Sequence, residues 1–575
     1  QMDDSLPSSF DVIVVGTGLA EAMLAAAAAR SGCSVLHLDE CAYYGGEWAS
    51  FNLRSIDEWA ERERKKERGE DEAPPAPDAS LVREGESLTR IRRRPTIRVT
   101  RDEWTKASSA PSTRAAPAAG AADGEDGDVP APPPVPTWRE DAEEHWRRFS
   151  IDISPKVLLS RGDLVRTLCD SEVSAYAEFK LVDRLLGVAR SRTEEAGTPI
   201  DTVDVHRIPC SRGDIFDSTA LSMLDKNRLM KLLKLCMQWH AAPDQCDKIR
   251  ASASTPFAAF LAAEKITGGL AQLLTRSLSF LSPAGESPTT EEAIGGLCKF
   301  MDSVGVFGAS PFLVPLYGSG ELPQCFARLC AVFGGTYCLG RPVEGIVESE
   351  GSVRAVLVAG QRVDCAHLLM TSAYAPGKWM NEDSSTTVSR AVLVANGSVR
   401  EEEKESISLL NLGGLAPAAG ARLLEVGWEA CTAPRGYYVA QITAHGDASG
   451  LVDDVIATMY KEEEVAGERD EDEKKKRKPL LLRRIEWRQS EYAPGADVPS
   501  NVGLLRLPDA TADYGSVMEE AKALFARFWP DRDFLPRALK KEQEDGEPFD
   551  ARDEEGEVKE EKKEEEVNEE NTVAE

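Results

Sequence analysis

The chain has 575 residues, enough for two or more folded units, because single hydrophobic cores stop growing at roughly 250–300 residues. Its formal net charge is −30 and its sequence pI is about 4.8. This charge excludes a general nucleic-acid or anionic-membrane binder, since such proteins carry an excess of Lys and Arg. It favours protein partners with basic surfaces.

The twelve cysteines are scattered without a CxxC pair. This spacing favours reduced thiols over a zinc cluster or a disulfide framework. No stretch has the pattern of a signal peptide, and the apolar run 22–29 is far shorter than the roughly 20 residues of a membrane span. We therefore expect a protein of the cytoplasm, in the cytosol, that makes only transient contact with membranes.

Residues 10–22 open the chain with a dinucleotide-binding pattern. The apolar run Val12 to Val15 predicts a strand, Gly16 and Gly18 predict a tight turn, and small residues then predict a helix. A second predicted strand ends at Asp39, which lies about twenty residues further on, as the pattern requires. The sequence therefore predicts a Rossmann-like βαβ unit.

One position of this pattern is altered. Where the third glycine belongs, the chain has Glu21, whose carboxylate falls near the helix N-terminus that would hold a pyrophosphate. A second obstruction follows near the C-terminus, where the bulky Leu507 and Pro508 precede Asp509. We therefore predict that Gly16, Gly18 and Asp39 are vestiges and that the chain binds no cofactor.

Composition divides the chain into ordered and disordered parts. Residues 60–140 are rich in charge, Pro, Ala, Ser and Gly and cannot bury enough apolar surface to fold, so we predict a disordered insert. The full set of predicted segments is an α/β domain over 1–59, 141–211 and 304–535, a helical domain over 212–303, a charged loop over 461–478 and a disordered acidic tail over 536–575.

No catalytic constellation stands out. The six histidines show neither HExxH spacing nor grouping with cysteine, which makes a metal site improbable, and neither a GxSxG elbow nor a P-loop is present. We therefore name no catalytic residue and no metal ligand. The remaining enzymatic alternative is an FAD-dependent oxidoreductase. Glu21 in place of the third glycine argues against it.

Two blocks carry a resemblance to a known family. Tyr43-Tyr44-Gly45-Gly46 follows the second strand, and 315–337 reads PLYGSGELPQCFARLCAVFGGTY. Here the chain resembles the Rab GDP-dissociation-inhibitor and Rab escort protein superfamily, and the resemblance spans the ordered chain to about residue 535. It implies a flavoprotein-like, GDI-type two-domain α/β fold with mixed sheets, which has lost its cofactor, and an inserted all-helical domain.

The escort and inhibitor branches differ in length and in local sequence. The segments 47–51, 208–216 and 328–335, the long insert and the acidic tail resemble the escort branch. That branch is a non-catalytic accessory, component A, of Rab geranylgeranyltransferase. It binds newly made GDP-bound Rab, presents it to the transferase α/β heterodimer for prenylation of C-terminal cysteines, and delivers the product to membranes. The alternative is a general inhibitor that recycles prenylated Rab.

The resemblance also implies binding residues. The Rab-binding platform would consist of Tyr44, Glu321, Gln324, Arg328 and Thr336. Three of these fall at i, i+3 and i+7 of a predicted helix over 322–333, which places them on one face. Where the inhibitor branch has Met two residues after the threonine, this chain has Cys338.

The predicted helical domain would have two tasks under the same resemblance. The helix over 218–239 would contact the transferase, with Leu235 as an exposed anchor and Arg250 following it, although Leu235 equally fits a position in the core of the domain. Helices within 256–281 would line a groove for the geranylgeranyl lipid of prenylated Rab, each buried CH₂ contributing about 0.8 kcal/mol.

Overall fold

The computed structural model describes residues 5–71, 75–114, 135–195, 198–208, 222–268, 270–271, 274–275, 288–400, 406–415, 420–463 and 478–537. The chain divides into two units, Gln1–Pro536 and Arg537–Glu575. Of the predicted acidic tail, only residues 536 and 537 are among those described, and most of the predicted charged loop lies outside them.

The first large sheet contains the dinucleotide-binding pattern. Its strand order is β12-β2-β1-β15-β14-β13-β4, with β21 also paired to β15. The strands are β1 (Ser9–Val15), β2 (Val35–Leu38), β4 (Ser87–Arg90), β12 (Thr336–Cys338), β13 (Val343–Ser349), β14 (Ser352–Val358), β15 (Gln361–Thr371) and β21 (Val502–Leu505). β1 runs parallel to β2 and β15, which confirms the predicted βαβ unit.

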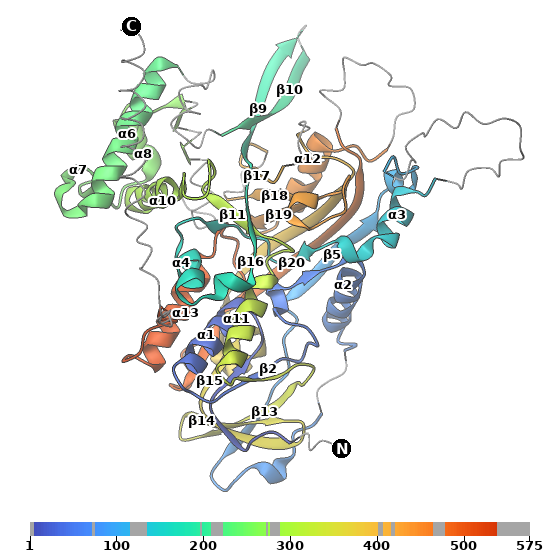
Figure 1. Cartoon of the computed structure of the whole chain (residues 1–575), viewed down its shortest axis with the longest axis vertical. Coiled ribbons are helices and arrows are strands. Elements are labelled where there is room, and N and C mark those ends of the chain that lie inside the picture. The colour runs from blue at the N-terminus through green and yellow to red at the C-terminus, as the bar shows by residue number, and fades with distance from the viewer. Residues whose placement is uncertain are drawn as a thin grey trace, which may run out of the picture. The chain divides into compact units, whose positions relative to one another are not determined.

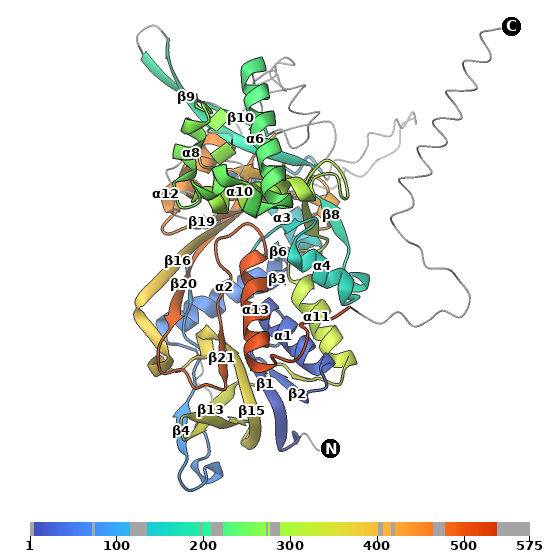
Figure 2. The same ribbon diagram turned by 90° about the vertical axis from the view of Figure 1, so that its left-hand side faces the viewer.

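Three helices cover one face of this sheet. They are α1 (Leu19–Arg30), α11 (Glu321–Val332) and α13 (Gly515–Phe528). α1 is buried along nearly its whole length and shares a core with apolar residues of α11 and α13. Figure 2 shows the three helices side by side above β1 and β15. The small residues of α1 allow this close packing on both sides.

The second large sheet has the strand order β10-β9-β17-β18-β19-β16-β20-β5. Its strands are β5 (Ile97–Trp104), β9 (Arg184–Glu195), β10 (Thr198–Arg207), β16 (Met380–Ala395), β17 (Ser408–Asn411), β18 (Arg422–Val426), β19 (Tyr438–His445) and β20 (Leu481–Pro494). Helix α12 (Ser449–Met459) packs on one face, while Ile56 and Trp59 of α2 (Leu53–Arg68) pack on the other.

Smaller elements join the large sheets. A three-stranded sheet contains β7 (Leu158–Leu159), β11 (Phe312–Pro315) and β8 (Phe179–Leu181), and a two-stranded sheet contains β3 (Ser50–Phe51) and β6 (Ile151–Asp152). Two short helices, α3 (Trp138–Glu144) and α4 (Asp163–Asp170), complete this region. These elements place β6 and β11 beside the start of α11.

A group of helices lies between β10 and β11 in sequence. Its described members are α6 (Met223–Ala241), α7 (Asp247–Arg250), α8 (Phe257–Ala263) and α10 (Thr290–Ser303). They share one apolar core and stand together in Figure 1. They fall within the predicted helical segment 212–303. Most of the predicted helix over 269–281 lies outside the described residues.

The prediction of disorder over 60–140 is wrong for much of that segment. Helix α2 continues to Arg68, where Trp59, Ala60 and Glu63 are buried, and β4 and β5 pair with β13 and β20. The polar composition is compatible with order because both strands lie at sheet edges. There the neighbouring strand pairs with the backbone hydrogen-bonding groups on one side, and solvent pairs with those on the other. Residues 115–134 lie outside those described.

Candidate functional site

The glycine turn between β1 and α1 is formed as predicted. Gly16 has a φ of +98°, and a Cβ atom there would collide with the Thr371 hydroxyl, so only glycine fits. The Asp39 carboxylate accepts hydrogen bonds from the Thr17 amide at 2.9 Å, the Thr17 hydroxyl at 2.6 Å and the Cys41 amide at 2.8 Å. Asp39, the acid that would bind a ribose hydroxyl of a cofactor, is thus already hydrogen-bonded to Thr17 and Cys41.

Glu21 fills the space at the N-terminus of α1. Its side chain is 2% exposed, and Thr371 donates a hydrogen bond to Glu21 Oε1 at 2.6 Å. A Cβ atom on Gly18 would meet the other carboxyl oxygen, so this carboxyl lies directly over the turn. Burial raises the pKa of Glu21 from 4.5 to about 8, which makes the buried side chain mainly neutral at pH 7.

The C-terminal segment around Asp509 is bonded to a buried lysine. Lys156 is 1% exposed and donates to Asp509 Oδ1 at 2.6 Å, to the Thr511 carbonyl at 2.7 Å and to the Asp513 carbonyl at 3.0 Å. Burial lowers the pKa of Lys156 to about 8, while the lysine charge helps to hold the pKa of Asp509 below its usual range. These contacts close the segment against the domain.

A cavity of only about 30 Å³ remains between Trp48 and the segment 507–509. Such a volume holds a water molecule but no dinucleotide. Glu491, Glu520 and Arg506 also line it, and the Arg506 guanidinium is already paired with Glu520 at 3.1 Å. The residues present therefore do not fit the cofactor that the glycine pattern suggests.

The start of α11 is built on a buried carboxylate. Asp152 of β6 accepts hydrogen bonds from the Ser319 amide and the Ser319 hydroxyl, both at 2.9 Å, and from the Ser50 hydroxyl at 2.5 Å. Ser50 Oγ in turn accepts a hydrogen bond from the Gly320 amide at 2.8 Å. These hydrogen bonds fix the orientation of the first turn of α11. They therefore also fix which side of α11 faces solvent.

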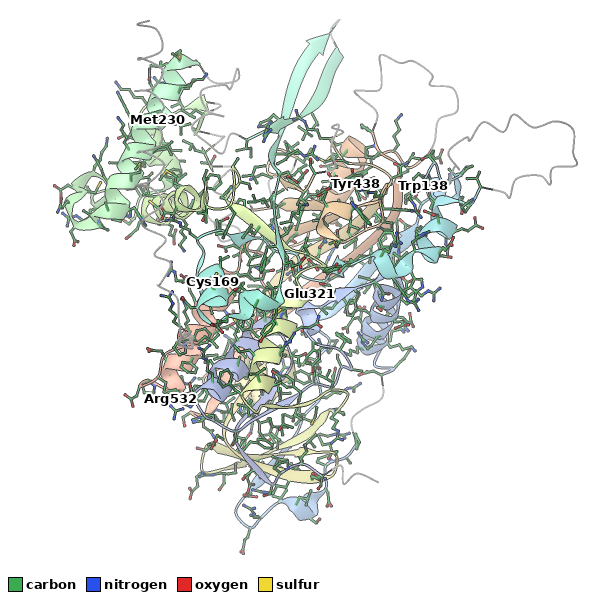
Figure 3. The ribbon with its side chains drawn as sticks, in the orientation of Figure 1. Trp138, Cys169, Met230, Glu321, Tyr438 and Arg532 are labelled. Carbon is green, nitrogen blue, oxygen red and sulfur yellow. The ribbon has the colours of Figure 1, made fainter. Side chains whose placement is uncertain are left out.

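The outer face of α11 carries a polar row, Glu321, Gln324 and Arg328. Gln324 and Arg328 are exposed and Glu321 is half-buried, which raises the pKa of its carboxyl. The Arg328 guanidinium lies 4.2 Å above the ring of Tyr176. Figure 3 shows Glu321 at the end of α11 that faces the middle of the molecule. The i, i+3, i+7 spacing thus produces the single helix face predicted from sequence.

The remaining predicted platform residues, Tyr44 and Thr336, lie next to β2 and in β12. Thr336 pairs with Leu36 of β2, and the ring of Tyr44 meets the ring of Tyr337 edge-on at 5.8 Å. Both residues are half-buried. Thr336 follows α11 in the chain through Gly334 and Gly335, and Tyr44 lies against the next residue, Tyr337.

Two comparisons of sequence decide the family. The family model described as GDP dissociation inhibitor matches residues 2–73 and 137–447, which is more than half of the chain. A Caenorhabditis elegans protein named Rab proteins geranylgeranyltransferase component A 1 is 40% identical over 94% of this chain and 97% of its own length. The chain belongs to the GDP dissociation inhibitor family. A second model, RAE1/2 domain I, C-terminal region, matches residues 388–510.

Further relatives within the GDP dissociation inhibitor family differ in how much of the chain they cover. The human protein named Rab proteins geranylgeranyltransferase component A 1 is 30% identical over 93% of both chains. Rat Rab GDP dissociation inhibitor beta is 25% identical over 64% of this chain. The structure of Rab GDI from Plasmodium falciparum has a TM-score of 0.62 at 17% identity and covers 92% of this chain, which confirms the GDI-type fold.

The helical part of this family member bears on one predicted residue. Leu235 is half-buried and packs against the helical core, which favours the core alternative over an exposed anchor. Met237, two residues further on, is 51% exposed, and Arg250 is exposed beside Asp247. Helical periodicity did not distinguish these positions because apolar residues surround much of α6.

Sequence reasoning missed two residues beside α11. Tyr176 lies under Arg328, and Tyr317 is 56% exposed at the turn before the helix. Tyr317 belongs to the block 315–337 that carries the family resemblance, but no spacing marks either tyrosine as exposed. Among the described residues, no group of three or more His, Cys, Asp or Glu side chains could hold a metal ion, and no helix has the length and apolarity of a membrane span.

Proposed function

We propose that this chain is a Rab escort protein, the component A of a Rab geranylgeranyltransferase. It binds newly made Rab in the GDP form, presents it to the transferase for prenylation of its C-terminal cysteines and delivers the prenylated product to membranes. The observation that carries the proposal is the full-length match to component A proteins, which extends through the region 388–510. The inhibitor relative covers only 64% of the chain.

The polar row of α11 supplies the recognition chemistry for this task. Arg328 offers up to five N–H donors and Gln324 both a donor and an acceptor, while Glu321 offers a carboxyl group. The Asp152 network holds these side chains on a rigid helix, which limits the entropy lost on binding. Preference for the GDP form follows because the switch regions of GTPases differ between nucleotide states.

The role is that of an accessory rather than a catalyst. Asp39 and Glu21, the residues nearest to a flavoprotein site, are bonded within the chain. Bond formation and the catalytic zinc then belong to the transferase. The helical part would contact the transferase and shelter the lipid, with the exposed Met237 as a second apolar candidate besides Leu235, and with Arg250. The site of action is the cytosol, with transient membrane contact during delivery.

A reconstituted prenylation reaction tests this proposal. Unmodified GDP-bound Rab, geranylgeranyl diphosphate and purified transferase are incubated with and without the protein, and lipid transfer is measured by mass spectrometry. We expect transfer to depend on the added chain. Arg328→Ala should lower the rate at limiting protein by about tenfold or more, because truncating a charged interface group typically costs 2–5 kcal/mol.

The control is Arg354→Ala, which removes another exposed arginine, on β14, whose ion pair with Glu350 lies at the surface. It should leave the rate unchanged. If the protein does not stimulate transfer but extracts prenylated Rab from membranes, the general inhibitor alternative is right and the escort proposal is wrong. A flavin absorbance spectrum from the purified protein would instead favour the oxidoreductase alternative.

A further inference from the structure

Three exposed aromatic side chains belong to segments that contact α11 or the turn before it. Tyr317 is 56% exposed, Trp428 39% and Tyr176 38%. Tyr317 precedes α11, Trp428 begins the 3-10 turn Trp428–Ala430 and Tyr176 ends the 3-10 turn Val173–Tyr176. We refer to these three residues as the aromatic surface. Clustered exposed apolar groups of this kind are typical of protein interaction sites.

Tyr317 holds a backbone conformation that favours glycine. Its φ is +64°, in the left-handed region that bulky residues rarely adopt. Hydrogen bonds hold the backbone on both sides: the Tyr317 amide donates to the Ala430 carbonyl at 3.0 Å, and the Ser150 hydroxyl donates to the Tyr317 carbonyl. The preceding Leu316 amide donates to the Glu178 carbonyl at 2.9 Å.

The residue that follows Tyr317 also has a left-handed backbone and is closely packed. Gly318 has a φ of +96°, and a Cβ atom there would collide with Asp152 and Ser50, the residues that hold the start of α11. The turn is thus closely packed at Gly318, while the Tyr317 side chain is 56% exposed and forms a hydrogen bond with Cys431. Unfavourable backbone conformations persist where the surroundings over-determine them, and they concentrate at functional sites.

The aromatic surface is continuous with the polar row. Tyr176 lies under the Arg328 guanidinium at 4.2 Å. The turn that begins with Trp428 provides the carbonyl that holds Tyr317, and it is tied to β8 by the ion pair between Lys180 and Glu429. Arg435 lies 5.1 Å from the Trp428 ring centroid. One rigid surface therefore combines three aromatic rings with hydrogen-bonding and charged groups.

We propose that Tyr317, flanked by Tyr176 and Trp428, is the apolar anchor of the surface through which this chain binds GDP-bound Rab. This inference rests on the proposed function and adds to it the residues that supply buried apolar area. The polar row by itself offers hydrogen bonds but little apolar surface. Tyr, Trp and Arg are the residue types that dominate the binding energy of protein interfaces, and here they occur together.

The two parts of the surface differ in their kinetic effect. Charged groups at an interface act on the association rate and on its salt dependence, because they steer the encounter. Aromatic anchors act on the dissociation rate, because their contacts form only in the docked complex. Loss of Tyr317 should therefore speed dissociation of the complex and leave association and its salt dependence near those of the parent protein.

The decisive variant is Tyr317→Gly in the full chain. Glycine removes the ring and adopts a φ of +64° without strain, so the variant should fold with an unfolding temperature equal to or above that of the parent. We expect the dissociation rate from immobilised, unprenylated, GDP-bound Rab to rise by about tenfold or more. Trp428→Ala should produce a smaller rise, and Tyr317→Phe, which keeps the ring, should bind like the parent.

Arg328→Ala is measured in parallel to separate this inference from the proposed function. If Arg328→Ala weakens binding while Tyr317→Gly and Trp428→Ala bind like the parent, the aromatic anchor is wrong and the proposed function stands. If none of the three variants changes binding to Rab, both the anchor and the platform on α11 are overturned. If Tyr317→Gly slows association without changing dissociation, the ring does not act as an anchor.

Discussion

Glu21→Gln is expected to raise the free energy of unfolding by on the order of 3 kcal/mol at pH 8. Burial raises the pKa of Glu21 in the folded protein from 4.5 to about 8. Between these two pH values the folded state holds a proton that the unfolded state has released. The stability that Glu21 contributes is therefore fully present below about pH 4.5 and is lost as the pH rises towards 8. Glutamine stays neutral and keeps the acceptor for Thr371.

The measurement is urea unfolding of both proteins from pH 4 to pH 8.5. The difference in unfolding free energy between variant and parent should be small at pH 4 and should grow with pH. The matched control is Glu344→Gln, since Glu344 is also buried but accepts the Gly360 amide at 3.1 Å, and this change should not stabilise the protein. A difference between Glu21→Gln and the parent that is independent of pH would contradict the prediction.

Lys156→Met is expected to lower the free energy of unfolding by about 2–3 kcal/mol at pH 7. The lysine is buried and is bonded to the Asp509 carboxylate and to the carbonyls of Thr511 and Asp513. Methionine has a similar volume but donates no hydrogen bond. The substitution removes the lysine donor from Asp509, Thr511 and Asp513. Asp509 keeps the hydrogen bonds from the Thr511 amide and hydroxyl, and the Thr511 carbonyl keeps the one from Arg422, so the loss is that of the lysine's own hydrogen bonds.

Lys378→Met serves as the control for Lys156→Met. Lys378 pairs with Glu348 at 2.6 Å, but its side chain is 46% exposed, so its loss should cost about 1 kcal/mol or less. Urea unfolding at pH 7 compares both variants with the parent. Equal stabilities of the two variants would show that the Lys156 cluster contributes no more than a surface ion pair. Circular dichroism at low urea checks that each variant is folded.

The predictable parts of this protein are those in which neighbouring residues carry the pattern. The run Val12 to Val15 and the glycines that follow predict β1 and its turn because their pattern is contained in a few adjacent positions. The helix over 322–333 was likewise predicted, and the family resemblance pointed to its polar residues; α11 presents Gln324 and Arg328 to solvent on one face. Glu21 in place of glycine predicted an obstructed cofactor site, and the structure shows its carboxyl over the turn.

The insert and the helical anchor were not predictable in this way. Residues 97–104 read as part of a disordered segment, yet they form β5 because β20, almost four hundred residues later, provides hydrogen-bonding partners. The sequence fits an exposed and a buried Leu235 equally well, and only the packing of α6 against the other helices shows how far it is buried. In both cases the deciding partner lies far away in sequence, so local composition carries no information about it.

The sequence by itself determined the Rossmann-like start and the loss of its third glycine, because both depend on short-range spacing, while the family resemblance identified the polar residues of α11. Only the tertiary structure decided that Lys156 closes the segment at Asp509 and that Tyr317 is held outward in a left-handed conformation. These features depend on contacts between segments more than a hundred residues apart. Burial and backbone conformation at such positions are set by packing, which no local pattern encodes.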